Sequence, residues 1–215
     1  MMLSARARRP IRLKVGAGES LIQWLLMPNL SRFRKEIPDA SVGFLNRRSN
    51  KIIEGLIDGD LDLGVVRETA MTKQLAHISF GSFGYKLFVP KKMSKDLADS
   101  LSPDEIKDIR IALLAGRGEF RSSVDQYCAN TSKHNDIELE CSSFTQLAYA
   151  VSSLGFAAIL PDFVEGIFNK GKVTAHSLKG FKHKRKLVIA WNPRRAESRP
   201  VIKKAAKSLK KLLNG

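Results

Sequence analysis

The stretch VGAGESLIQWLLMPNLSRFRKEIPDASVGF, residues 15–44, contains the pattern that decides the fold of this chain. Residues 11–16, which overlap the start of this stretch, alternate apolar and basic side chains, and this alternation predicts a half-buried strand. A helical spacing of apolar residues follows, with a kink expected near Met27 because Pro28 has no N–H to donate. A second strand is expected at 41–45. A strand, a helix and a strand in this order predict a parallel α/β unit with a right-handed crossover.

The next stretch, SNKIIEGLIDGDLDLGVV at 49–66, repeats the alternation of helix and strand. Ser49 is expected to be the N-cap of a helix that ends at Asp58-Gly59. A third strand is expected at 61–66. The first third of the chain therefore predicts a three-stranded α/β unit.

A second α/β series begins after residues 67–82, which are polar and predicted to be irregular. A short helix is expected to begin at Ser102-Pro103, with Pro103 at its first helical position. Beyond residue 171 the chain is expected to be basic and irregular, before one strand at 187–191 and a last helix from about Glu197. The strands of the second series are expected at 85–90, 109–114, 137–141 and 156–160, and its longer helices at about 120–129, after Ser142-Ser143 and after Pro161.

A third stretch of the sequence is SSFTQLAYAVSSLGFAAILPDF at 142–163. Together the three stretches resemble the effector-binding domain of LysR-type transcriptional regulators. The family shows the same order of a small-residue turn, a helix with Leu-Leu-Pro, a capped helix running into Gly-Asp-Leu-Asp, and a helix ending in Gly-x-Gly-Ile-x-x-Leu-Pro. Ala157 stands where the family has the second glycine of that ending. The resemblance extends in order and spacing over residues 11–213.

This resemblance implies an α/β fold of the two-lobed, periplasmic-binding-protein-like (type 2) kind with two crossover segments. After a basic N-terminal tail at 1–10, lobe I would comprise 11–74 and 182–215, and lobe II would comprise 75–181. The resemblance also implies assembly into homo-oligomers.

One departure concerns the winged helix-turn-helix with which family members begin. Residue 11 already begins the effector-binding pattern, so this module is absent from the sequence. Two explanations stay open: the chain is a fragment of a longer regulator, or it is a stand-alone sensor. In either case DNA would be reached through an absent or partner module, or weakly through a basic lobe.

The charge of the chain is concentrated at its two ends. The sequence has 37 Lys and Arg against 21 Asp and Glu, a net charge of +16. Residues 1–14 hold five basic and no acidic residues, and residues 179–211 hold thirteen basic residues and one acidic. If both ends belong to one lobe, that lobe is strongly positive and attracts nucleic acid or another polyanion. The alternative is a solvated basic face without a partner.

Several classes of protein are disfavoured by what the sequence lacks. No apolar run is long enough to span a membrane, and no export signal is visible, which favours the cytoplasm. The four histidines are scattered, and neither a nucleophile elbow nor a phosphate-binding Gly-Lys-Ser/Thr loop occurs. We therefore expect no enzyme activity, no cofactor and no metal. Cys128 and Cys141 are interpreted as reduced thiols, with a redox pair left open.

The candidate ligand site follows from the ends of strands and the starts of helices, which converge between lobes in such a fold. Free N–H groups at helix starts favour an anion, and Arg48 and Arg117 add charge for a carboxylate or phosphate. Glu19 favours an amine or a hydroxyl-rich ligand instead, so the charge of the effector stays open. Ser49 and Ser142 have the simpler interpretation of helix caps. The candidate ligand-binding residues are Gly18, Glu19, Ser20, Arg48, Ser49, Arg67, Arg117, Gly118, Ser142, Ser143 and Pro161.

The leading functional hypothesis is a domain that senses a small-molecule effector in the cleft between its lobes and is coupled to transcriptional control. A solute-binding protein of the same fold is one alternative. A non-specific nucleic-acid-binding protein is another, with contacts expected from Arg194, Lys203, Lys204 and Lys207.

Overall fold

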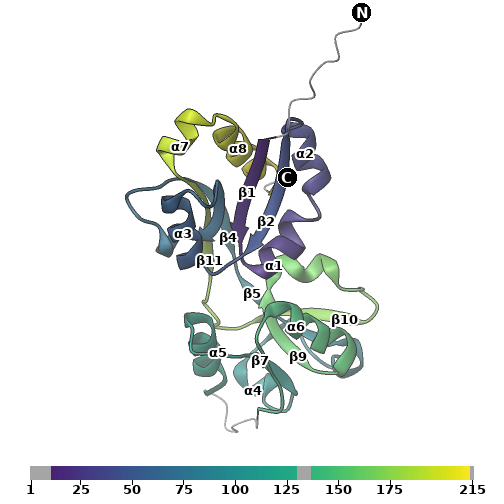
Figure 1. Cartoon of the computed structure of the whole chain (residues 1–215). Coiled ribbons are helices and arrows are strands. Elements are labelled where there is room, and N and C mark those ends of the chain that lie inside the picture. The colour runs from purple at the N-terminus through teal and green to yellow at the C-terminus, as the bar shows by residue number, and fades with distance from the viewer. Residues whose placement is uncertain (1–10, 130–136, 214–215) are drawn as a thin grey trace, which may run out of the picture. The chain divides into compact units, whose positions relative to one another are not determined.

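The computed structural model describes residues 11–129 and 137–213, and the chain divides into two compact α/β units (Figure 1). Unit 1 comprises Met1–Gly81 and Lys186–Gly215, and unit 2 comprises Ser82–Arg185. The chain thus passes twice from one unit to the other, at 81/82 and 185/186. The lobe boundaries expected from the sequence are 74/75 and 181/182. The mixed α/β class with two separate sheets is confirmed.

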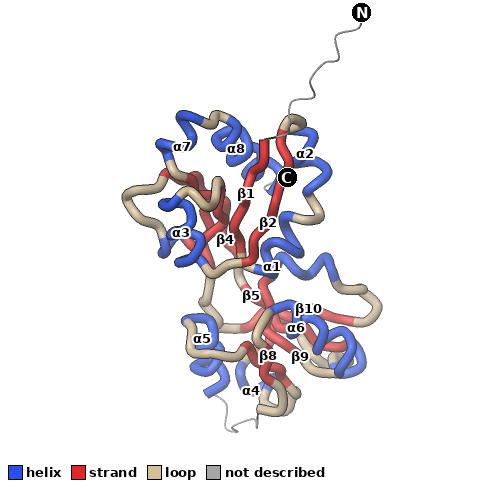
Figure 2. The backbone as a smooth tube through the Cα atoms, viewed as in Figure 1, coloured by secondary structure: helices blue, strands red, loops and turns tan. Residues whose placement is uncertain are grey.

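Unit 1 is built on a five-stranded sheet with the order β2-β1-β3-β11-β4. Strand β1 pairs in parallel with β2 and with β3, whereas β11 runs antiparallel to β3. Figure 2 shows the helices of this unit (blue) around its strands (red). The elements of unit 1 are β1 (Ile11–Ala17), α1 (Glu19–Leu21), the π-helical turn η1 (Ile22–Leu26), α2 (Leu30–Glu36), β2 (Ala40–Asn46), α3 (Ser49–Asp58), β3 (Leu63–Arg67), the 3-10 turn η2 (Glu68–Ala70), β4 (Ala76–Phe83), β11 (Arg185–Trp191), α7 (Pro193–Ser198) and α8 (Val201–Leu213).

Unit 2 is built on a six-stranded sheet with the order β6-β10-β5-β9-β7-β8. Strand β7 pairs in parallel with β8 and with β9, while β5 is antiparallel to both β9 and β10. The elements of unit 2 are β5 (Tyr85–Pro90), the 3-10 turn η3 (Lys91–Met93), β6 (Ser100–Leu101), α4 (Pro103–Ile106), β7 (Ile111–Leu114), α5 (Glu119–Ala129), β8 (Glu140–Cys141), α6 (Phe144–Tyr149), the π-helical turn η4 (Ala150–Leu154), β9 (Ala157–Pro161), the 3-10 turn η5 (Asp162–Ile167) and β10 (Val173–Leu178).

The breaks in the helices follow from proline and glycine. The helical segment after β1 ends at Leu26 and α2 begins at Leu30, which confirms the interruption predicted from Pro28. Asn29 uses its amide to close the gap, donating from Nδ2 to the Leu25 carbonyl at 2.9 Å. Helix α3 ends as predicted at Gly59, whose φ of +84° is a conformation that glycine adopts without strain.

Four local predictions are wrong. Residues 67–82 are not irregular, because Ala76, Ile78 and Phe80 alternate with polar residues to form β4. The basic stretch after 171 includes strand β10, which pairs with β5 and β6. The last helix is two helices, α7 and α8, separated where Pro200 cannot donate an N–H. The N-cap of α3 is Arg48, and Ser49 is its first helical residue.

Each unit has its own core. In unit 1, α3 packs on the sheet through Ile52, Ile53 and Leu56, and a Cβ on Gly16 would lie 2.7 Å from Leu61 Cδ1. A larger residue at that position would therefore have to displace the side chains of Leu61 and Ile52, because the helix and its following turn lie directly against the strand. In unit 2 the core combines aliphatic residues with an aromatic group, in which Tyr85 and Phe120 lie at a ring-centroid distance of 4.5 Å. Both cores hold the parallel strands in register, and these strands carry the candidate site residues.

Candidate functional site

The six candidate residues of unit 1 all follow strands that end at the same edge of its sheet. Ala17 at the end of β1 is paired with Asn46 at the end of β2, and Gly16 is paired with Gly64 in β3. The turn after β2 is fastened to β1, because the Arg47 N–H donates to the Ala17 carbonyl at 3.1 Å. The structure thus brings the six residues together at one edge of the sheet, which we call the carboxyl edge of unit 1. The six are Gly18, Glu19, Ser20, Arg48, Ser49 and Arg67.

Neither helix that starts at the carboxyl edge of unit 1 has a side-chain cap. Gly18 at the start of α1 and Arg48 at the start of α3 both have extended backbone, and neither N-cap residue makes a side-chain cap hydrogen bond. The N–H groups of a first helical turn have no partner within the helix and carry partial positive charge. The exposed side chains of Arg47 and Arg48 add two full positive charges beside them. Two exposed carboxylates lie at the same edge, Glu19 and Glu68, and Glu68 is paired with Lys186 at 3.8 Å. The arrangement suits an anion of small size.

The five candidate residues of unit 2 also follow parallel strands, but most of them have structural partners. Ser143 is the N-cap of α6, and its Oγ accepts from the Gln146 N–H at 3.3 Å. Ser142 donates from both its N–H and its Oγ to Gln146 Oε1, at 2.8 and 3.0 Å. The helix start that the sequence predicts here is confirmed with Ser143 as its cap, whereas Ser142 does not cap α6. Pro161 is buried at the end of β9, where Tyr85 is its partner in the sheet.

Arg117 and Gly118 differ from these three residues because both are exposed in the loop between β7 and α5. The turn of this loop is made by Gly116 with a φ of +97°. The Gly118 carbonyl accepts the Ser122 N–H at 3.0 Å, which begins the helix. The loop thus offers an exposed guanidinium at the carboxyl end of a parallel strand, as Arg48 does in unit 1.

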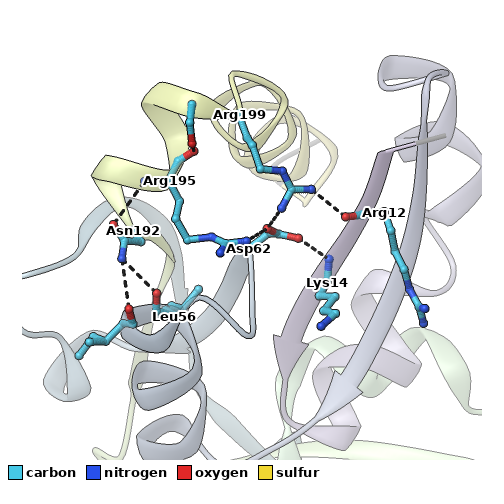
Figure 3. Close-up of polar contacts among 9 residues, drawn as sticks. Arg12, Lys14, Leu56, Asp62, Asn192, Arg195 and Arg199 are labelled. Atoms are coloured by element: carbon cyan, nitrogen blue, oxygen red, sulfur yellow. Dashed lines mark hydrogen bonds and ion pairs between the residues drawn. The ribbon is translucent and has the colours of Figure 1, made fainter. Parts of the chain in front are cut away.

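A polar cluster at the opposite, amino-terminal edge of the unit 1 sheet was missed by sequence reasoning (Figure 3). Of the two acids Asp60 and Asp62, which lie in the turn before β3, Asp60 is exposed and Asp62 is 3% exposed. Asp62 Oδ1 accepts from Arg195 Nη2 at 3.0 Å and from Arg199 Nη1, and Asp62 Oδ2 accepts from the Lys14 N–H at 2.9 Å.

This Asp62 cluster fastens the end of the chain to its beginning. Arg199 also donates from Nη2 to the Arg12 carbonyl at 2.9 Å. Asn192 accepts from the Arg194 and Arg195 N–H groups at the start of α7 and donates to the carbonyls of Leu56 and Ile57 at the end of α3. Since every oxygen of the buried carboxylate has a partner in unit 1, the cluster is a structural site rather than a ligand site.

The aromatic group of the unit 2 core holds a histidine that sequence reasoning did not single out. Phe120 and Phe144 pack together at a centroid distance of 5.2 Å. The His183 ring lies 5.3 Å from that of Tyr85, and its Nδ1 is 2.9 Å from Ser123 Oγ. Burial, followed by the positive charge of Arg185, lowers the pKa of His183. Both effects favour the neutral imidazole, against the smaller opposing effect of Glu119.

The two cysteines of unit 2 form no disulfide, and Cys141 is buried whereas Cys128 is half-buried. Burial raises the pKa of both thiols, and Asp125 adds to the effect on Cys128. Thiols with a raised pKa are poorly reactive at neutral pH, because the thiolate is the nucleophile. Within residues 11–129 and 137–213, no group of three or more His, Cys, Asp or Glu side chains is placed to hold a metal ion. Over the same residues, no helix has the length and apolar character needed to cross a bilayer.

The family model described as the LysR substrate binding domain matches residues 7–211 of this chain. The chain belongs to this family. Curated relatives of this LysR substrate binding domain include the probable RuBisCO transcriptional regulators of Emiliania huxleyi, 23% identical over 196 residues, and of Synechocystis sp., 21% identical over 192 residues. The alignments cover 88% and 86% of this chain but only 62% and 56% of the relatives. The chain thus spans little more than half the length of these proteins.

Solved structures support the same fold for the LysR substrate binding domain. The reduced OxyR regulatory domain from Pseudomonas aeruginosa has a TM-score of 0.75 at 17% identity, covering 95% of this chain and 97% of that one. The LysR family regulator CbnR has a TM-score of 0.70 at 15% identity, covering 92% of this chain and 68% of that one. These similarities confirm the periplasmic-binding-protein-like (type 2) fold class that the sequence predicts.

Proposed function

We propose that this LysR substrate binding domain is a regulatory domain that senses a small anionic effector, bound at the carboxyl edge of unit 1. The observation that carries the proposal is the pair of uncapped helix starts, α1 and α3, which lie at adjacent strand ends beside Arg47 and Arg48. A carboxylate or phosphate group would accept hydrogen bonds from the first-turn N–H groups and from a guanidinium. The positive charge of the two arginines exceeds the negative charge of Glu19, which favours an anion over an amine.

We extend the proposal to Arg117 and Gly118 of unit 2, which follow β7 in the way that Arg48 follows β2. Ser142 and Ser143 are less suited to a ligand, because Gln146 already engages both hydroxyl groups. Pro161 is buried and would contribute only apolar contact. Gly18 would let a ligand approach the backbone closely, since a Cβ there would meet no atom within 4 Å.

The effector would act by population shift. A ligand that binds one conformation of the regulator better than another favours that conformation by its differential affinity. The resemblance to regulators that carry a DNA-binding module suggests that transcription is the process controlled, through a module attached to this domain or to a partner. A regulatory role needs no catalytic group, which agrees with the absence of catalytic motifs from the sequence.

The test is a thermal-shift screen of small carboxylates and phosphorylated metabolites, followed by calorimetry of those that stabilise the protein. Replacing Arg48 with Ala should weaken a binding anion about 10- to 100-fold, since a charge-assisted hydrogen bond contributes about 1.5–3 kcal/mol. Arg117→Ala tests the contribution of unit 2 in the same way.

The matched control is Lys51→Ala, which removes the same charge one turn further along α3, where Lys51 is exposed and paired with Glu54 at 2.6 Å. This variant should bind the anion as the parent does. Equal loss in Arg48→Ala and Lys51→Ala, or stabilisation by amines alone, would contradict the proposed site.

A further inference from the structure

The basic charge of the chain lies mainly on one unit. The described residues of unit 1 include 19 Lys and Arg against 9 Asp and Glu, whereas the sequence of unit 2 has 15 against 12. The excess in unit 1 is greatest in its last segment, where residues 186–215 hold nine basic residues and only Glu197 is acidic. The positive charge is therefore a property of particular elements and not of the whole surface.

Helix α8 separates apolar and basic side chains onto opposite faces. Ile202, Ala205, Ala206 and Leu209 are buried in unit 1. The other face carries five exposed lysines, Lys203, Lys204, Lys207, Lys210 and Lys211, and the helix has no acidic residue. From Lys203 to Lys211 the stripe is about 12 Å long at about 1.5 Å per residue.

Helix α2 packs against α8 and carries further exposed basic residues. It buries Phe33 and exposes Arg32, Arg34 and Lys35, with Glu36 as its one acidic residue. We call the exposed basic residues of the two helices the basic face: Arg32, Arg34, Lys35, Lys203, Lys204, Lys207, Lys210 and Lys211.

The side chains of the basic face have no anionic partner among the described residues. This distinguishes them from Arg195 and Arg199, just before α8, whose charges are held by Asp62. Eight like charges on two neighbouring helices repel one another, so their placement weakens the fold slightly unless a counter-charge is bound.

We propose that the basic face binds the phosphate backbone of double-stranded DNA without regard to base sequence. Along the 12 Å stripe of lysines a duplex presents about seven phosphates, one per about 1.7 Å of axis. Lysine suits this contact because it is a mobile point charge rather than a fork that selects one geometry. The basic face offers no apolar or aromatic side chain to insert into a bilayer, because the apolar side of α8 is buried in the unit 1 core, so a lipid surface fits less well.

The basic face is separate from the proposed effector site. Helix α2 leads into the amino-terminal end of β2, and Arg199 just before α8 contacts Arg12 near the amino-terminal end of β1. The effector site lies at the carboxyl ends of the same strands. DNA binding can therefore fail while effector binding holds, and the reverse.

The test is fluorescence anisotropy of a labelled duplex of random sequence, titrated with the whole chain at several salt concentrations. The parent should bind at low salt, with log Kd rising linearly with log salt concentration as counterions are released. The triple variant Lys203→Glu, Lys204→Glu, Lys207→Glu should bind at least about tenfold more weakly, and its salt slope should fall by about 3.

The matched control is the triple variant Lys91→Glu, Lys92→Glu, Lys95→Glu, which changes the net charge by the same six units on exposed lysines of unit 2. Its Kd for the duplex should lie within about twofold of that of the parent. Its salt slope should equal that of the parent, because the basic face is intact. If circular dichroism shows that charge reversal perturbs α8, the milder variant Lys203→Gln, Lys204→Gln, Lys207→Gln replaces it. This variant should also bind the duplex more weakly than the parent and the unit 2 control.

Three results would overturn the proposal. The first is equal loss of binding in the α8 and unit 2 triple variants, which would mean that net charge alone is responsible. The second is the absence of duplex binding by the parent at about 20 mM salt, where phosphate contacts are strongest. The third is displacement of the duplex by polyglutamate at an equal concentration of charge, which would indicate an acidic protein as the partner.

Discussion

The two edges of the unit 1 sheet use arginine in opposite ways. At the amino-terminal edge, Arg195 and Arg199 are held on Asp62, a carboxylate that is 3% exposed. At the carboxyl edge, Arg47 and Arg48 are exposed, and no described residue forms an ion pair with either of them. Charges whose partners lie within the fold contribute to stability, whereas charges without internal partners are available to a ligand. The position of a charge relative to the sheet thus separates the stabilising cluster from the candidate site.

The largest expected effect comes from removing the carboxylate at the amino-terminal edge. Asp62→Ala leaves two half-buried guanidinium groups and the Lys14 N–H without their acceptor, which should cost about 3 kcal/mol of unfolding free energy. Urea denaturation followed by tryptophan fluorescence measures this loss in unit 1, because Trp24 and Trp191 both belong to that unit. The control Asp60→Ala removes an exposed carboxylate two residues away, and its stability should stay within about 0.5 kcal/mol of the parent. A similar loss in both variants would refute the distinction between the two edges.

A smaller effect is expected from the helix starts of the two units. Ser143→Ala removes the cap of α6 and should cost about 1 kcal/mol, because the Gln146 N–H loses its acceptor. Ser49→Ala removes a hydroxyl that caps nothing in α3 and should change stability by less than about 0.5 kcal/mol. Hydrogen exchange of the first turns of α6 and α3 measures the two effects locally. Equal loss of protection in both helices would show that α3 is capped by its serine after all.

The smallest expected effect is a dependence of unit 2 stability on pH. Ser123 donates to the Glu119 carbonyl at 2.8 Å, so its oxygen is left to accept from His183 Nδ1. The pKa of His183 is lowered in the folded state, which means that the unfolded chain binds a proton more readily. This contribution to stability is present above the unfolded pKa of about 6.5 and is lost as the pH falls below it.

The measurement compares urea midpoints at pH 7.5 and 5.5 for the parent and for His183→Gln, followed by far-ultraviolet circular dichroism. The parent should lose more stability on acidification than the variant, which has no titrating group at this position. The rest of the sequence is the same in both proteins, so the difference isolates His183. A larger loss of stability in His183→Gln than in the parent would contradict the lowered pKa of His183.

The elements of this fold that depend on local sequence were predictable. The alternation at 11–16, the break at Pro28 and the left-handed Gly59 each act within a few residues, and the structure has all three. Strand β4 was missed although Ala76, Ile78 and Phe80 alternate with polar residues, because the polar composition of the segment suggested a loop. Here the periodic pattern outweighed the polar composition.

The Asp62 cluster could not have been predicted from local sequence. The arginines that hold Asp62 lie 133 and 137 residues further along the chain, and nothing near Gly59-Asp60 indicates that they return to this point. By contrast, the parallel strands predicted from alternating helices and strands were sufficient to gather Gly18, Arg48 and Arg67 at one edge. Which of these residues touch an effector remains a prediction.

The discontinuity of unit 1 imposes an order on its biosynthesis. The ribosome releases the whole of unit 2 as one uninterrupted segment, but unit 1 needs β11, α7 and α8, which are made last. At about 5–20 residues per second, Asp62 emerges roughly 7–27 seconds before the arginine 133 positions later that neutralises it. For that interval the nascent chain must keep a partly built sheet, with the β3 edge exposed, from pairing with other strands, and a chaperone that recognises such edges would act on this intermediate.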